Sequence, residues 1–146
     1  MTTKPVMSIA ACKSALDNIC ANCNTGGAGS LFIRSGAQPA ATTTGDSGTL
    51  GATLGLNATA FGASTNATAD GLATATANAI TNETNAPNSI TAGHFRIKNG
   101  SSVVVFQGNV GTSLADMIMN TTTITAGDTV ACPSFKATLP CGDGVS

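Results

Sequence analysis

The hydrophobic pattern of this 146-residue chain changes its period once, after Gly29, and this change constrains the fold more than any other feature. Before Gly29, apolar residues recur at steps of three and four, as on one face of a helix. They are Ile9, Cys12, Leu16, Ile19, Cys20 and Cys23. After Gly29, short segments alternate between apolar and polar residues, as half-buried strands do. The sequence therefore predicts one amphipathic helix at about residues 6–20, followed by strands.

Turn-forming residues divide the rest of the chain into short strand candidates. These are residues 30–35, 49–57, 72–81, 94–98, 101–107, 116–120, 121–125 and 129–139. Asn99-Gly100 predicts a tight two-residue hairpin turn, because Asn and Gly readily take positive φ. Pro133 places the last strand at an edge or a bulge. The pattern predicts a mainly β fold, an antiparallel β-sandwich or jelly roll with one short N-terminal α-helix.

The length fits one domain, and no linker interrupts the pattern. We expect an N-terminal arm at residues 1–5, which ends in Pro5. A single β-sandwich domain at residues 6–140 follows and includes the helix. Residues 141–146 form a C-terminal tail rich in Gly.

Charged residues are scarce and balanced, which excludes several classes of protein. They make up 9% of the chain, against about 25% in ordinary soluble domains. Six basic residues face seven acidic ones, so the basic excess that nucleic-acid binding requires is missing. No apolar run approaches the roughly 20 residues of a membrane span, and no secretory signal is recognisable. We expect neither nucleic acid nor a membrane as a partner.

Few residues are available for catalysis. His94 is the only histidine, and the acidic residues are scattered mainly over turns and termini. Gly45-Asp-Ser-Gly48 resembles the nucleophile segment of chymotrypsin-like proteases, but that chemistry needs a histidine base held by a buried aspartate. A Gly-Asp-Ser-Gly turn is the simpler interpretation. We expect a protein that is not an enzyme, with no catalytic residue and no cofactor.

The five cysteines leave three interpretations open. An odd number cannot all pair within one chain. Cys20 and Cys23 have the spacing of a zinc knuckle, so Cys20, Cys23, Cys132 and Cys141 are candidate zinc ligands, although the second pair is spaced too widely for a knuckle. One or two disulfides are the second possibility. Buried structural thiols are favoured, because a free cysteine packs as a small hydrophobic residue.

The surface must be built mainly from small neutral residues, since the chain contains 23 Thr, 24 Ala and 12 Asn. Such side chains lose little entropy when they are ordered against a neighbour, and they cost little desolvation. This composition favours a subunit of an assembly.

Several segments together resemble a group of small β-rich virion proteins of tailed bacteriophages. The recurring pieces are Ala15-Leu-Asp17, Leu31 to Ala40, Ala52-Thr-Leu54, Ala60-Phe-Gly62, Ala75 to Ile80, Phe95-Arg-Ile97, Val110 to Asp116, Met119-Asn120 and Ile124 to Gly127. The resemblance implies a non-enzymatic head decoration (cement) protein, made in the bacterial cytoplasm and located on the capsid surface of the virion. It implies binding to the outside of an HK97-type head and bridging of capsomers.

The implied partners are the major capsid protein and copies of the chain itself, with oligomers formed on the lattice. Loops carry binding on β scaffolds, so we expect residues 1–20, 37–48 and 82–92 to reach neighbours. The interface candidates are Thr2, Lys4, Pro5, Gln38, Pro39 and Pro87. A tail or fibre component of the phage is one alternative. A secreted adhesin or pilin-like subunit is another, and it would require a disulfide such as Cys132–Cys141.

Overall fold

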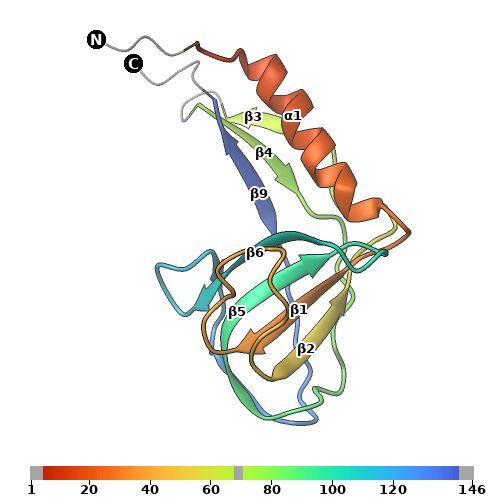
Figure 1. The fold of residues 1–146 in the computed structure, drawn as a ribbon, viewed down its shortest axis with the longest axis vertical. Helices are drawn as coiled ribbons and strands as arrows, with labels where there is room; N and C mark the ends of the chain where they lie inside the picture. The colour runs from red at the N-terminus through yellow and green to blue at the C-terminus, as the bar shows by residue number, and fades with distance from the viewer. Residues whose placement is uncertain (1–4, 68–70, 142–146) are drawn as a thin grey trace.

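The structure, a computed structural model, describes residues 5–67 and 71–141. It is mainly β and β-sandwich-like, with one N-terminal helix and two sheets. The larger sheet occupies one end of the molecule, and the helix with the smaller sheet occupies the other (Figure 1). The predicted fold class is confirmed.

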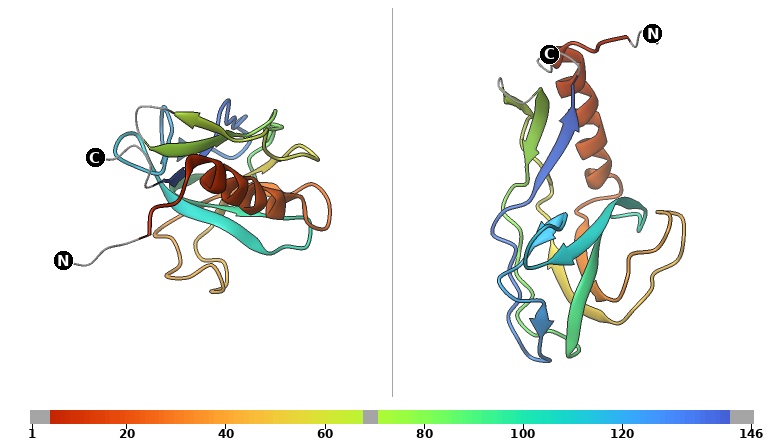
Figure 2. Two further views of the ribbon diagram at one scale, coloured as in Figure 1. Left: turned by 90° about the horizontal axis from the view of Figure 1, so that it is seen from above. Right: turned by 90° about the vertical axis from the view of Figure 1, so that its left-hand side faces the viewer.

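Helix α1 spans Ile9–Ala21, and the short 3-10 helix η1 (Asn22–Asn24) continues it. It begins at Ile9 because the hydroxyl of Ser8 accepts a hydrogen bond from the Ala11 N–H and caps the first turn. The helix packs on the smaller sheet (Figure 2), and its buried residues are Cys12, Leu16 and Cys20. The apolar stripe is narrower than predicted, because Ile19 remains exposed.

The larger sheet contains β1 (Ser30–Ser35), β2 (Leu50–Gly55), β5 (Ile90–Lys98), β6 (Val104–Gly111) and β7 (Met117–Ile118) in the order β2-β1-β5-β6-β7. A short strand, β8 (Thr123–Ile124), pairs with the start of β5. All pairs are antiparallel except β6–β7. Alternation directs one set of side chains into the core, namely Leu31, Ile33, Ala52, Leu54, Phe95 and Ile97.

The smaller sheet has the order β3-β4-β9, with β3 at Thr65–Ala67, β4 at Leu72–Thr76 and β9 at Lys136–Pro140. In β4 the alternating alanines Ala73 and Ala75 are buried, as the sequence pattern predicts. The strand is shorter than the predicted 72–81. Beyond it, isolated bridges replace the ladder, for example between Gly55 and Thr81.

Four of the five phenylalanines connect the two sheets. Phe135, which directly precedes β9, lies edge-on to Phe95 of β5, with ring centroids 5.5 Å apart. Phe61 contacts both Phe135 and Phe106, each at 6.1 Å. Tilted and edge-on ring pairs are the favoured arrangements of aromatic side chains. The buried residues of both sheets therefore form one core cluster.

The β5–β6 hairpin is confirmed, but the prediction of a two-residue turn is wrong. Residues 100–102 form a three-residue loop, in which Ser102 rather than Gly100 has positive φ. The loop is wider because the Asn99 side chain is buried, accepts from the Ser101 and Val103 N–H groups, and donates to Asn22 O. Gly100 serves a different purpose, since its α-carbon packs directly against the backbone of Gly26.

We predict that Gly100→Ala destabilises the protein by about 1–3 kcal/mol, because the added methyl group would overlap the Gly26 carbonyl. Urea unfolding monitored by circular dichroism measures the effect. Gly45→Ala is the matched control, since nothing lies within 4 Å of the position that its added methyl group would take, and we expect its stability to change by less than about 0.5 kcal/mol. Equal stability of the two variants would contradict the close approach.

Candidate functional site

The face of the larger sheet that points away from the core carries a polar layer. Arg34 of β1 lies opposite His94 of β5, and Arg96 and Lys98 follow His94 at alternate positions. The β1–β2 loop (residues 36–49) covers this layer and supplies its acceptors. The sheet is therefore buried on both faces along β5, where Arg96 is only 1% exposed.

Asp46 of the β1–β2 loop is the anion of this layer. Its Oδ2 lies 2.7 Å from Lys98 Nζ and 3.2 Å from Arg34 Nη2, and its Oδ1 lies 2.9 Å from Arg96 Nη1. Hydrogen bonds from Lys98 and Arg96, with the nearby charges of Lys98 and Arg34, lower the pKa of Asp46 from 3.8 to about 2, against a smaller opposing effect of burial. One carboxylate thus joins three cations from two strands.

Neutral acceptors complete the environment of Arg96. Gln107 Oε1 of β6 accepts from Arg96 Nε and Nη2, and the Ala41 carbonyl accepts from Nη2 at 3.0 Å. Gln107 in turn donates to the carbonyl of Pro39 at 2.9 Å. Because a buried guanidinium is stable only when it is paired and hydrogen-bonded, these contacts fix the path of the loop.

The Gly45-to-Gly48 segment is an irregular part of the loop, bound into this network directly after a hydrogen-bonded turn at Ala41–Thr44. Asp46 binds the three cations, and Ser47 Oγ donates to the Ala37 carbonyl at 3.4 Å. The Gly48 carbonyl accepts from Arg34 Nη1, and Gly48 has a φ of +69°. These contacts give the segment a structural role, but the turn predicted at Gly45–Gly48 lies a few residues earlier, at Ala41–Thr44, because the segment itself is held by its side-chain contacts with the sheet.

The predicted interface residues differ in their exposure to solvent. Thr2 and Lys4 lie outside the described residues, whereas Pro5, Gln38 and Pro87 are exposed. The prediction for Pro39 is wrong: this residue is buried, because Gln107 and Arg96 draw the loop down onto the sheet.

The cysteines are all buried. Cys12, Cys20 and Cys23 lie on α1 and η1, Cys141 follows Pro140, whose carbonyl oxygen contacts Cys12 Sγ, and Cys132 lies beside the larger sheet. Burial is the main cause that raises the pKa of Cys20 to about 11 and that of Cys23 to about 12, and it also raises the pKa of Cys132. The thiols of these three cysteines therefore stay protonated near neutral pH. The preferred interpretation, structural thiols, fits this burial.

Neither cross-linked interpretation fits the placement of Cys132 and Cys141. Cys132 lies beside β7 and β8 of the larger sheet, whereas Cys141 follows β9 at the helix end and donates its N–H to Gly71 O. The extended strand between them spans roughly 16 Å, far beyond the Cα separation of a disulfide, roughly 4–7 Å. Within residues 5–67 and 71–141, no three His, Cys, Asp or Glu side chains gather as a metal site, so the four zinc candidates do not form one ligand set.

A second feature, which the sequence pattern did not indicate, is the loop between β6 and β7 (residues 112–116). Asp116 Oδ2 accepts from the Asn109 N–H at 3.0 Å, and Asn109 Oδ1 accepts from the Asp116 N–H at 2.7 Å. This reciprocal pair closes the loop. At its tip, Leu114 is 100% exposed with a φ of +49°, a conformation that costs a leucine roughly 1–2 kcal/mol.

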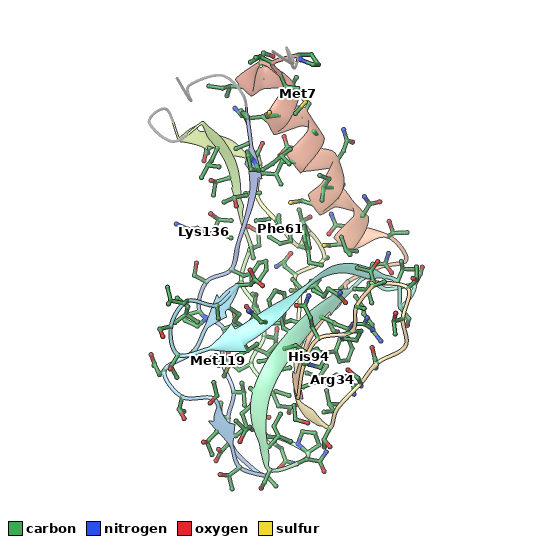
Figure 3. All side chains as sticks on the ribbon, turned by 60° about the vertical axis from the view of Figure 1, so that its left-hand side comes forward. Met7, Arg34, Phe61, His94, Met119 and Lys136 are labelled. Atoms are coloured by element: carbon green, nitrogen blue, oxygen red, sulfur yellow. The ribbon has the colours of Figure 1, made fainter. Side chains whose placement is uncertain are left out.

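A groove of about 670 Å³, lined by both apolar and polar side chains, lies next to this loop. It runs between residues 115–124 and residues 128–136, and its lining includes Met117, Ile118, Met119, Pro133 and Phe135. Ile118 is 66% exposed at the edge of the sheet. Met119 and Lys136 mark this side of the molecule in Figure 3. We call the exposed Leu114, together with the apolar side chains of the neighbouring groove, the apolar patch.

Comparison with protein-family models, with curated proteins and with solved structures finds no match. Among the described residues, α1 is the longest helix, and no helix has both the length and the hydropathy of a membrane span. The function must therefore be inferred from the polar layer, the apolar patch and the sequence.

We predict that Asp46→Asn lowers the free energy of unfolding at pH 7 by about 2–3 kcal/mol, less than the loss of a fully buried pair, because Arg96 keeps its neutral acceptors. The pKa of Asp46 is lowered on folding, so its contribution is present above pH 4 and is lost as the pH falls toward 2. Urea unfolding at pH 7, 4 and 2 measures both effects. Asp128→Asn removes the same charge from a carboxylate that accepts a backbone N–H, and we expect it to leave the free energy of unfolding nearly unchanged. Equal losses in the two variants would contradict the central role of Asp46.

We predict that Cys132 and Cys141 are not joined by a disulfide in the isolated protein. Lys136 lies between them, so trypsin should release Cys132 and Cys141 on separate peptides after unfolding without a reductant, each carrying a maleimide label. Mass spectrometry distinguishes these from a linked pair of peptides. A linked pair would contradict the described placement of β9.

Proposed function

We propose that this chain is a non-enzymatic structural protein of a tailed-phage virion, and that it decorates the outside of an HK97-type head, where it bridges capsomers. The observation that supports the proposal most strongly is the apolar patch. Hydrogen bonds between Asn109 and Asp116 fix the β6–β7 loop, and Leu114 at its tip is fully exposed to solvent beside the groove. A leucine held in this way is arranged in advance for burial against another protein surface. The sequence resemblance supplies the identity of that surface.

The distribution of charge supports the same proposal. The polar layer uses three of the chain's six basic residues, Arg34, Arg96 and Lys98, and one of its seven acidic residues, Asp46. The outer surface is left mainly to small neutral residues, which dock at little cost in desolvation or side-chain entropy. The partners proposed are the major capsid protein and further copies of this chain.

The helix end of the molecule offers a second contact. Val6 and Met7 are exposed, at 63% and 50%, just before the Ser8 cap. The end of β9 lies at the same end of the molecule (Figure 1). We propose that this end and the apolar patch contact different neighbours, as a protein that bridges subunits requires.

Two alternatives make different predictions. A tail or fibre component would use the same surfaces but would be present in few copies per particle. A secreted adhesin or pilin-like subunit would require a stabilising disulfide, and the placement of Cys132 and Cys141 argues against the pair on which this alternative relied.

We predict that Leu114→Asn weakens binding to heads assembled without this chain by roughly ten- to a hundredfold, as expected from the burial of one leucine side chain. The fold should be unaffected or slightly more stable, because asparagine tolerates positive φ and the Leu114 side chain is wholly exposed. Co-sedimentation at several concentrations measures the binding. Val103→Asn alters an exposed apolar residue of the β5–β6 hairpin loop and should bind like the wild type. Unchanged binding of the Leu114 variant would contradict the role of the patch.

We predict that removal of residues 1–5 reduces retention on heads more than it reduces stability. Ser8, which caps α1, and all described core residues remain in the shortened chain. Retention during dilution and urea unfolding of the isolated protein are compared. Equal loss of both would show that these residues serve folding instead.

A further inference from the structure

The single histidine of the chain lies under the β1–β2 loop with half of its hydrogen-bonding capacity used. His94 is 0% exposed, and its Nδ1 lies 3.0 Å from the carbonyl oxygen of Gly36, the first residue of the loop. A carbonyl only accepts, so Nδ1 carries the proton. His94 Nε2 is buried and has no hydrogen-bond partner in the described part of the chain. The neutral imidazole therefore fits the closed loop.

The charges around His94 do not suit a positively charged ring. Arg34 lies directly opposite on β1 (Figure 3), and Arg96 and Lys98 share the same face of β5. Strand β6 contributes the neutral Asn109 opposite His94 and Gln107 beside Arg96. The loop contributes Asp46, whose two oxygens already bind the three cations. Asp116 lies beside Gly108 and exchanges hydrogen bonds with Asn109, whose backbone N–H its carboxylate accepts.

Protonation would therefore add a fourth cation to a layer with one carboxylate. It would also create a buried N–H at Nε2 for which no acceptor is in place among the described residues, and an unsatisfied buried donor destabilises a structure strongly. Histidine is the side chain that ordinarily changes charge between pH 5 and 8.

The element that can relieve this strain is the loop. Strand β5 is fixed by ladders to β1 and β6, whereas the loop is held mainly by side-chain contacts to carbonyls and to Asp46. Gly93 packs so closely on Gly36 that no side chain would fit between them, which places the start of the loop directly on the histidine strand. Local opening takes place where backbone ladders are few.

We propose that His94 makes the opening of the β1–β2 loop depend on pH. Its neutral ring keeps the loop closed, and its protonation releases the loop. This inference is independent of the proposed function. Release would change the surface formed by Gln38 and by Thr42, Thr43 and Thr44, all of which are exposed. Mildly acidic conditions would thereby alter what this face of the protein can contact.

Hydrogen exchange of the full chain, followed by mass spectrometry, tests this pH-dependent opening of the β1–β2 loop. Rates are corrected for the intrinsic effect of pH. Between pH 7.5 and 5.5, we expect peptides over residues 36–49 to lose up to about tenfold in protection, as linkage to the uptake of one proton allows, while peptides over the β5–β6 hairpin keep theirs. In His94→Asn, the Asn Nδ2 replaces His Nδ1 as donor to Gly36 but cannot titrate, so the pH effect should vanish. Asp46→Asn should have an exposed loop at both pH values.

Equal loop protection at both pH values in the wild type would overturn the proposal, as would an unchanged pH effect in His94→Asn. A second measurement does not depend on the variant folding. Because His94 is the only histidine, its Hε1 resonance in a proton NMR spectrum is identified without assignment. We expect its titration midpoint to coincide with that of loop opening, and an imidazole that titrates without any change in loop protection would also overturn the proposal.

Discussion

The ion pair between Arg96 and Asp46 is the interaction on which the rest of the structure depends. Arg96 lies in the middle of β5, the strand that pairs with both β1 and β6, and its guanidinium is withdrawn from water. A buried cation needs a counter-charge and a full set of acceptors. Gln107 of β6 supplies one acceptor, and Asp46 and Ala41 supply the counter-charge and the other acceptor from the same loop, so this loop is drawn across a face of the sheet that would otherwise be open to solvent.

This arrangement has consequences at some distance from the ion pair. The loop covers the outer face of β1 and β5, while the inner face packs on the phenylalanines that connect the two sheets. Charges that would ordinarily keep a surface soluble are used inside the protein. The remaining surface carries few charges, and its exposed large apolar side chains are found around Leu114, at the start of α1, at Ile19 and at Val103.

The sequence predicted those elements in which local pattern and burial agree. The helix face with Cys12, Leu16 and Cys20, the strand at 30–35 and the β5–β6 hairpin all follow from periodicity. Strand β3 did not follow, because three residues carry no period and its pairing with β4 is set by the tertiary fold. The turn of the hairpin was predicted wrongly, since the contacts of Asn99 and Gly100 with the end of the helix outweigh the local preference of Asn-Gly.

The candidate sites were less predictable. A charged residue in an alternating strand ordinarily indicates a solvent-facing position, so Arg96 gave no sign of its burial. Its partner Asp46 lies fifty residues earlier in the chain, in a segment rich in turn formers. The same segment led to the prediction that Pro39 lies on the surface. Leu114 is a single apolar residue in a polar loop, and only the reciprocal bonds of Asn109 and Asp116 reveal that it is held in place.

The number of copies of this chain relative to the major shell protein, measured by quantitative mass spectrometry of purified source particles, tests the proposed role most directly. A decoration protein that covers the head should be present at a ratio within a few-fold of one. A few to a few dozen copies per particle would instead indicate a tail or fibre component. Absence of the chain from every particle would contradict the virion assignment, and the apolar patch would then need a different partner.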